Sequence, residues 1–165
     1  MSCSDIISII DIAVSAGVGI WVATAIAKGQ TKERFLKEYF THELISIKEE
    51  CKVFFDDICY DQKSANDIKT GFKILSMRAK AFEDNLREVF KNSGICIHSC
   101  ITKIQIEITN SDEFNDQFKQ EKIKFGATQK ARFFEQRSLL LSAFSSSVID
   151  INKASVKRKG GKRNH

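Results

Sequence analysis

A long apolar segment near the start of the chain, IISIIDIAVSAGVGIWVATAIAK, constrains the fold more than any other feature. It covers 23 residues from Ile6 to Lys28, and Asp11 is the only charged residue before the terminal lysine. As a helix the segment would measure about 34 Å, enough to cross a hydrocarbon core of about 30 Å. Because it is apolar on all sides, unlike the amphipathic stretches that follow it, we predict a single transmembrane helix.

Two other interpretations of this segment compete with a membrane span. A secretory signal would explain the small residues Ala23-Thr24-Ala25, but it needs a positive region before the apolar core. Residues 1–5 contain Asp5 and neither lysine nor arginine. A buried core helix is the second alternative, and such helices are rarely apolar on every face over six turns.

The charges on either side of the segment predict its orientation. Asp5 precedes it, whereas Lys28, Lys32, Arg34 and Lys37 lie at its end and soon after it. The positive-inside rule therefore places the N-terminus outside and residues 29–165 in the cytoplasm, with one pass through the inner (cytoplasmic) membrane.

Small and polar residues recur at every fourth position of this segment. They are Asp11, Ser15, Gly19, Ala23 and Ala27. Such rows let membrane helices approach one another closely, so we predict a homo-oligomer. A carboxylate within a membrane usually faces a protein interior or a water-filled lumen, which makes Asp11 a candidate for the mouth of a pore.

The rest of the chain has the pattern of a helical bundle. It contains no proline, which suits long helices. Two stretches carry apolar residues at alternating spacings of three and four, which is typical of bundle helices. In residues 29–60 they are Leu36, Phe40, Leu44, Ile47, Cys51, Phe54 and Ile58. In residues 66–92 they are Ile68, Phe72, Leu75, Ala79, Phe82, Leu86 and Val89.

Turn signals separate the predicted helices. Ser64 or Asn66 is the expected N-cap of the helix over 66–92, and Asn92-Ser93-Gly94 is its expected end. Residues 95–109 fit a helix through Ile97, Ile101, Ile104 and Ile108, and a strand through Ile104, Ile106 and Ile108. We favour the helix because a lone strand would have no partner.

A last helical stretch is predicted from Asp112 to about Lys153, with Ser111 as its N-cap and Gly126 as a kink or interruption. Its expected buried residues are spaced by seven: Phe118 and Phe125, then Phe134, Leu141 and Val148. The predicted class is therefore all-α. A transmembrane anchor (1–28) precedes an antiparallel cytoplasmic bundle (29–153) and a basic flexible tail (154–165).

The net charge of +5 comes from this tail. Residues 32–152 carry 19 basic and 19 acidic residues, whereas residues 153–165 carry six basic residues and no acid. The bundle is therefore not a general nucleic-acid-binding surface. Contact with lipid or RNA is predicted for the tail alone, through Lys157, Arg158, Lys159, Lys162 and Arg163.

The motifs indicate little enzymatic chemistry, and we predict no cofactor. The chain has no glycine-rich phosphate loop, His-Glu-x-x-His motif or nucleophile elbow. Cys96, His98 and Cys100 could bind zinc from a strand, but on a helix His98 points about 200° away from the two cysteines. We therefore expect no metal site. We also expect structural thiols, because four of the five cysteines lie in the predicted cytoplasmic part, where thiols stay reduced.

Arg158 and His165 are separated by six residues. This is the loosest form of the Arg/His spacing of HEPN ribonucleases, in which His acts as acid and base and Arg stabilises the phosphate. Asn92 and His98 have a similar spacing without the arginine, because Arg87 lies more than a turn upstream of Asn92. The only catalytic candidates are therefore Arg158 and His165.

A membrane anchor, an acidic outer end, a small helical bundle and degenerate Arg/His spacing together resemble the membrane-anchored HEPN-like accessory proteins of type VI-B CRISPR systems. The resemblance covers the length and layout of the chain. It implies an oligomeric membrane pore that enhances antiphage defence by an RNA-guided ribonuclease through membrane depolarisation. It also implies that ribonuclease, or its RNA products, as a partner. A membrane-tethered HEPN-type ribonuclease and a non-enzymatic membrane scaffold are the alternatives.

Overall fold

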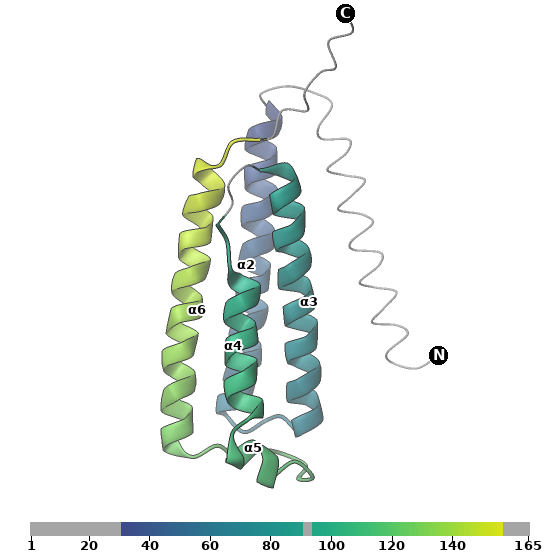
Figure 1. Ribbon diagram of the computed structural model, residues 1–165, viewed down its shortest axis with the longest axis vertical. Helices are drawn as coiled ribbons and strands as arrows, with labels where there is room; N and C mark the ends of the chain where they lie inside the picture. Colours follow the sequence, from purple (N-terminus) through teal and green to yellow (C-terminus); the bar gives the residue numbers. More distant parts are fainter. Residues whose placement is uncertain (1–30, 91–93, 157–165) are drawn as a thin grey trace, which may run out of the picture. The chain divides into compact units, whose positions relative to one another are not determined.

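The computed structural model describes residues 31–90 and 94–156, which form helices and connecting loops (Figure 1). The helices are α2 (Thr31–Cys59), α3 (Ala65–Val89), α4 (Ile97–Thr109), α5 (Asp112–Asp116) and α6 (Ala127–Lys153). The predicted all-α class is confirmed over these residues. The predicted transmembrane segment, residues 6–28, lies outside them, and no helix within them is both long and apolar enough to cross a membrane.

The chain divides into two compact units, residues 1–39 and residues 40–165, and α2 runs through the boundary. The described part of the first unit is the beginning of α2. Two ion pairs with the i, i+4 spacing support this helix, Lys37 with Glu33 at 3.1 Å and Arg34 with Glu38 at 3.0 Å. Such pairs add a few tenths of a kcal/mol each to a solvated helix.

Residues 40–165 contain an up-and-down bundle. α4 lies between α3 and α6, and consecutive long helices run in opposite directions (Figure 1). The part of α2 from Phe40 onward joins α3 through aromatic rings: Phe54 lies 5.0 Å from Phe72, and Phe40 lies 5.9 Å from Phe82. All fourteen apolar residues predicted for the faces of α2 and α3 are buried. The antiparallel helical bundle is thus confirmed.

The N-cap of α3 and the buried face of α4 agree with the sequence analysis. Ser64 caps α3 in a capping box with Asp67, in which each side chain accepts a hydrogen bond from the other residue's backbone N–H. The Ser64 hydroxyl also donates to the Asp67 carboxylate at 2.7 Å. This bond first, and then the bond from the Ser64 backbone N–H, favour the charged carboxylate and lower the pKa of Asp67. All four core residues predicted for a helix over residues 95–109 are buried on one face of α4, so the helical interpretation is confirmed. They are Ile97, Ile101, Ile104 and Ile108.

α3 ends earlier than predicted. Its last residue is Val89, and Phe90 adopts an extended conformation instead of continuing toward Asn92-Ser93-Gly94. The ring of Phe90 is buried 5.7 Å from that of Phe40, and its backbone pairs with Val156 in an isolated bridge. Tertiary packing therefore overrides the turn signal at the end of α3, and Val156, which precedes the basic residues of the predicted tail, pairs with Phe90.

The helical stretch predicted over 112–153 is interrupted at Gly126, as one of its two alternatives had it, but the break is longer than predicted. A loop over 117–126 separates the short α5 from α6, and Gly126 is the N-cap of α6. The buried face of α6 is also shifted by one position: it contains Phe133, Leu140, Phe144, Ser147 and Ile151. Of the predicted core residues, Phe134 is 52% exposed, Phe118 is 38% exposed, and Leu141 and Val148 are half-buried, whereas Phe125 is buried.

Gly71 of α3 is packed directly against α2. A β-carbon at this position would overlap Cε2 of Phe54, whose ring contacts those of Phe55 and Phe72. We expect Gly71→Ala to lower the free energy of unfolding by about 1–3 kcal/mol, because this overpacking outweighs the better helix propensity of alanine. Urea unfolding followed by circular dichroism measures the change. Gly94→Ala is the control, since its β-carbon would meet no atom within 4 Å, and equal stability of the two variants would contradict the prediction.

Candidate functional site

Most of the predicted site residues lie outside the described part of the chain. These are the small-residue row of the apolar segment (Asp11, Ser15, Gly19, Ala23 and Ala27), and the tail residues Lys157, Arg158, Lys159, Lys162, Arg163 and His165. The predicted oligomer face, pore mouth, lipid or RNA contact and Arg158/His165 pair therefore stay predictions.

A buried carboxylate joins two helices near the start of α4. Glu83 of α3 is only 5% exposed. Its Oε2 accepts a hydrogen bond from Nη2 of Arg87 at 2.9 Å, and its Oε1 accepts one from the backbone N–H of His98 at 2.8 Å. Because the first N–H groups of a helix have no partner within the helix, Glu83 acts as a cap for α4 supplied by another helix.

Glu83 thereby brings Arg87 and His98 to one place, although eleven positions separate them in the sequence. Arg87 also contacts Asp84 at 3.3 Å, and its side chain is half exposed. His98 is half-buried in the first turn of α4. Glu83 thus binds a guanidinium, which can hold a phosphate, and the backbone of His98, a residue whose imidazole can move a proton. The sequence analysis missed this cluster. The signal in the sequence was an acidic residue, Glu83, directly after Phe82 of the apolar stripe and four positions before Arg87.

The cysteine and histidine motif lies at the start of the same helix. Cys96 is the N-cap of α4, and Cys100 lies one turn further along, where its backbone N–H donates to the Cys96 carbonyl at 3.1 Å. Within residues 31–90 and 94–156, no group of three or more His, Cys, Asp or Glu side chains is arranged to hold a metal ion. Burial is the main cause that raises the pKa of Cys100, and the neighbouring Cys96 adds to it.

Two further cysteines are buried in the core. Burial raises the pKa of Cys51 to about 12, and burial also raises the pKa of Cys59. A raised pKa keeps a thiol protonated near neutral pH, and the protonated thiol is a poor nucleophile. Cys51 and Cys59 therefore act as small apolar core residues.

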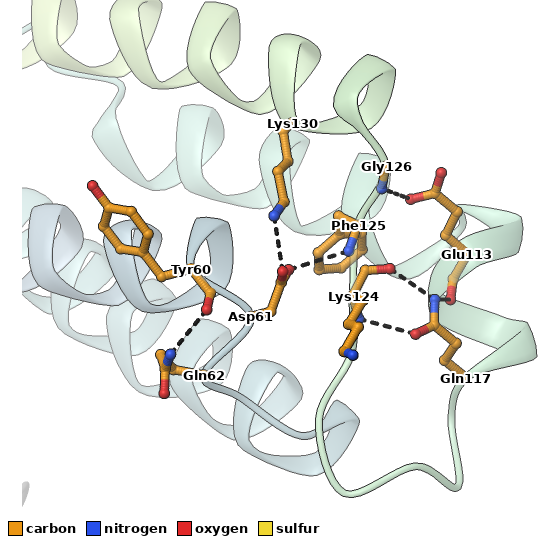
Figure 2. A network of polar contacts seen from close by, with 9 residues as sticks. All are labelled: Tyr60, Asp61, Gln62, Glu113, Gln117, Lys124, Phe125, Gly126 and Lys130. Atoms are coloured by element: carbon orange, nitrogen blue, oxygen red, sulfur yellow. Dashed lines mark hydrogen bonds and ion pairs between the residues drawn. The ribbon is translucent and has the colours of Figure 1, made fainter.

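A polar network closes the end of the bundle where α2 meets α3 (Figure 2). Asp61, with a positive φ of 57°, accepts hydrogen bonds from the backbone N–H of Phe125 at 3.3 Å and from Lys130 at 2.9 Å. The two residues that flank Phe125 in this loop are bonded by side chains of α5 and its C-cap. The Gln117 amide bonds both the N–H and the carbonyl of Lys124, and the Glu113 carboxylate accepts from the N–H of Gly126. Each of these polar groups has a structural partner, so we interpret the network as one that stabilises the conformation of the 117–126 loop.

A second polar cluster joins α2 to α3. Arg78 donates to Glu43 and Ser46 at 2.8 and 3.1 Å and also contacts Glu50. Both carboxylates are occupied by one guanidinium, so the cluster has the composition of an interhelical ion pair rather than of a catalytic acid and base. Of the three polar clusters described here, the Glu83–Arg87–His98 cluster is therefore the best candidate for a functional site.

Comparisons of this chain with protein-family models, with curated proteins and with solved structures found no match.

Proposed function

We propose that this protein is a membrane-anchored effector that forms a homo-oligomeric pore. In this proposal residues 6–28 cross the inner membrane with the N-terminus outside, and the bundle lies in the cytoplasm. The observation that carries the proposal is the 23-residue apolar segment with a single internal charge, Asp11, followed by basic residues. Several copies of Asp11 would form an acidic ring at one mouth of the pore, as in cation channels.

The bundle offers a surface that fits self-association. Phe134, Leu141 and Val148 lie seven residues apart on α6, beside its buried face, and Phe134 is 52% exposed. An apolar row left at the surface of a helix is the usual material of a helix–helix contact between subunits. We infer that a second copy of the chain covers this row, in addition to contacts along the small-residue row of residues 11–27.

The defence role in this proposal rests on the resemblance in length and layout. In that role the pore depolarises the membrane and strengthens antiphage defence by an RNA-guided ribonuclease. The ribonuclease or its RNA products would act on the cytoplasmic side, where the basic residues 157–163 can contact RNA or anionic lipid. A non-enzymatic scaffold that tethers a partner is the outcome if the protein carries no ions.

Ion flux across liposomes tests the pore. We expect Asp11→Leu to reduce cation flux or cation selectivity while the oligomer stays intact, because an acidic ring attracts cations. Asp5→Leu removes an acid that precedes the span, so it should leave the flux unchanged. Equal flux from the parent and Asp11→Leu would exclude Asp11 from the ion pathway. No flux from the parent would favour the scaffold.

A ribonuclease is the second candidate, and one observation favours it: Glu83 holds both Arg87 and the backbone of His98. The pore proposal predicts no RNA cleavage by the purified protein. If the parent does cleave RNA, His98→Ala separates this cluster from the Arg158/His165 pair, which His165→Ala removes. His42→Ala is the control, since His42 is exposed on α2 and far from Glu83 in the sequence.

A further inference from the structure

A groove between α3 and α4 carries positive charge that the described structure does not neutralise. Its volume is about 410 Å³, within the usual range of small-molecule sites. It is lined by Lys69, Lys73, Ser76 and Met77 of α3 and by Gln105 and Thr109 of α4. None of these six residues is acidic.

The two lysines are one helical turn apart on the same side of α3. Within the described residues, neither Lys69 nor Lys73 forms an ion pair with a carboxylate, although ten such pairs occur elsewhere. Like charges at positions i and i+4 repel each other and destabilise a helix. An anion placed between the two ammonium groups would remove this repulsion.

Lys69 is held in place by aromatic rings. Its Nζ lies 4.4 Å from the centre of the Phe118 ring and 5.9 Å from that of Phe114. A cation over an aromatic face is attracted to it and keeps its charge. One cation of the groove is therefore positioned before any ligand arrives, which lowers the entropic cost of binding.

Neutral donors complete the lining. The hydroxyl of Ser76 and the side-chain amide of Gln105 make no hydrogen bond to other described residues. The hydroxyl of Thr109, in contrast, donates to the backbone carbonyl of Gln105 at 2.9 Å. Two ammonium groups with a free hydroxyl and a free amide suit the several acceptor oxygens of a phosphate. Met77 is 48% exposed and offers an apolar wall beside them.

We propose that this groove binds the phosphate group of a soluble phosphorylated small molecule. Lys69 and Lys73 neutralise the phosphate, Ser76 and Gln105 donate hydrogen bonds to its oxygens, and Met77 packs against the organic part. The site goes beyond the proposed pore and does not depend on it. A phospholipid headgroup carries the same phosphate, so the test below includes a lipid vesicle.

Calorimetric titration of the full-length protein in detergent tests the site, with inorganic pyrophosphate and ATP as separate probes. We expect Lys73→Gln and Lys69→Gln each to weaken binding about tenfold, the usual loss for one charge-assisted hydrogen bond. Lys103→Gln is the matched control, because it removes the same charge from an exposed position of α4 that does not line the groove. Circular dichroism of each variant checks that the helices are intact.

Three results would overturn the proposal. The first is no binding of either probe at millimolar concentration. The second is equal weakening by all three substitutions, which would indicate a general attraction to a basic protein. The third comes from a parallel titration with vesicles containing phosphatidic acid: binding to these vesicles alone, lost with Lys73→Gln, would assign the groove to a lipid headgroup instead of a soluble ligand.

Discussion

Phe72→Ala is expected to lower the free energy of unfolding of the bundle by about 3–5 kcal/mol. Phe72 has no exposed surface, and its ring lies 5.0 Å from that of Phe54 and 5.9 Å from that of Phe55, both in edge-to-face contacts. Alanine would remove these contacts and leave a cavity that α2 and α3 cannot close without breaking their other contacts. A loss of this size is a large part of the 5–15 kcal/mol typical of a domain.

Urea unfolding of the full-length protein in detergent, followed by circular dichroism, measures this effect. Phe35→Ala is the matched control: it removes the same ring from a position on α2 that is 57% exposed and outside the proposed contact between subunits, and we expect a loss below about 1 kcal/mol. A Phe72→Ala variant as stable as Phe35→Ala would contradict the packing of α2 against α3 described here.

Deletion of residues 1–28, with a new initiator methionine, is expected to move the protein from the membrane fraction to the soluble fraction. The deleted residues contain the whole apolar segment from Ile6 to Lys28, which is the predicted anchor. The core of the bundle should remain folded, because the apolar residues on the buried faces of its helices follow residue 28. Carbonate extraction of membranes, followed by detection in pellet and supernatant, measures the change.

Deletion of residues 157–165 is the control for this experiment. It removes five basic residues but no apolar segment, so the shortened protein should still resist carbonate, which disrupts electrostatic attachment. If the chain without residues 1–28 stays in the carbonate-washed pellet, the anchor lies elsewhere. If it is soluble but keeps its oligomeric size, the bundle rather than the small-residue row holds the subunits together.

The small-residue row has its own test, which is the mass of the oligomer in detergent. Gly19→Leu should weaken the oligomer in detergent, because a larger side chain keeps two membrane helices apart. An unchanged mass would show that the row from Asp11 to Ala27 is incidental to assembly. The row of Phe134, Leu141 and Val148 on α6 would then be the principal contact between copies.

Three helices of the bundle could be read from spacing alone. The stripes over 36–58 and 68–89 each gather seven apolar residues on one face of a helix, so burying that face removes the most apolar surface from water. The same reasoning selects a helix for residues 97–109, since Ile97, Ile101 and Ile104 form one face. Ser64 and Ser111 were identifiable as caps because a hydroxyl in that position satisfies a free N–H of the next helix.

The candidate site was accessible to sequence reasoning only in part. The sequence indicates that Glu83 and Arg87 lie one turn apart on α3, but it gives no reason to place the start of α4 against them. That contact depends on where α3 ends, and α3 ends at Val89 because Phe90 packs against Phe40. The groove of Lys69 and Lys73 likewise exists only because α4 places Gln105 and Thr109 beside α3.

By itself the sequence determined the all-helical class, the buried faces of α2, α3 and α4, and the apolar segment before them, because each of these depends on local spacing. Tertiary structure alone decided the register of α6. Its sequence carries two apolar rows one position apart, Phe133 with Leu140 and Phe134 with Leu141, and local propensity cannot choose between them. Packing against α4 selects the first row even though it buries Ser147, whose hydroxyl is satisfied by the Ala143 carbonyl at 2.7 Å.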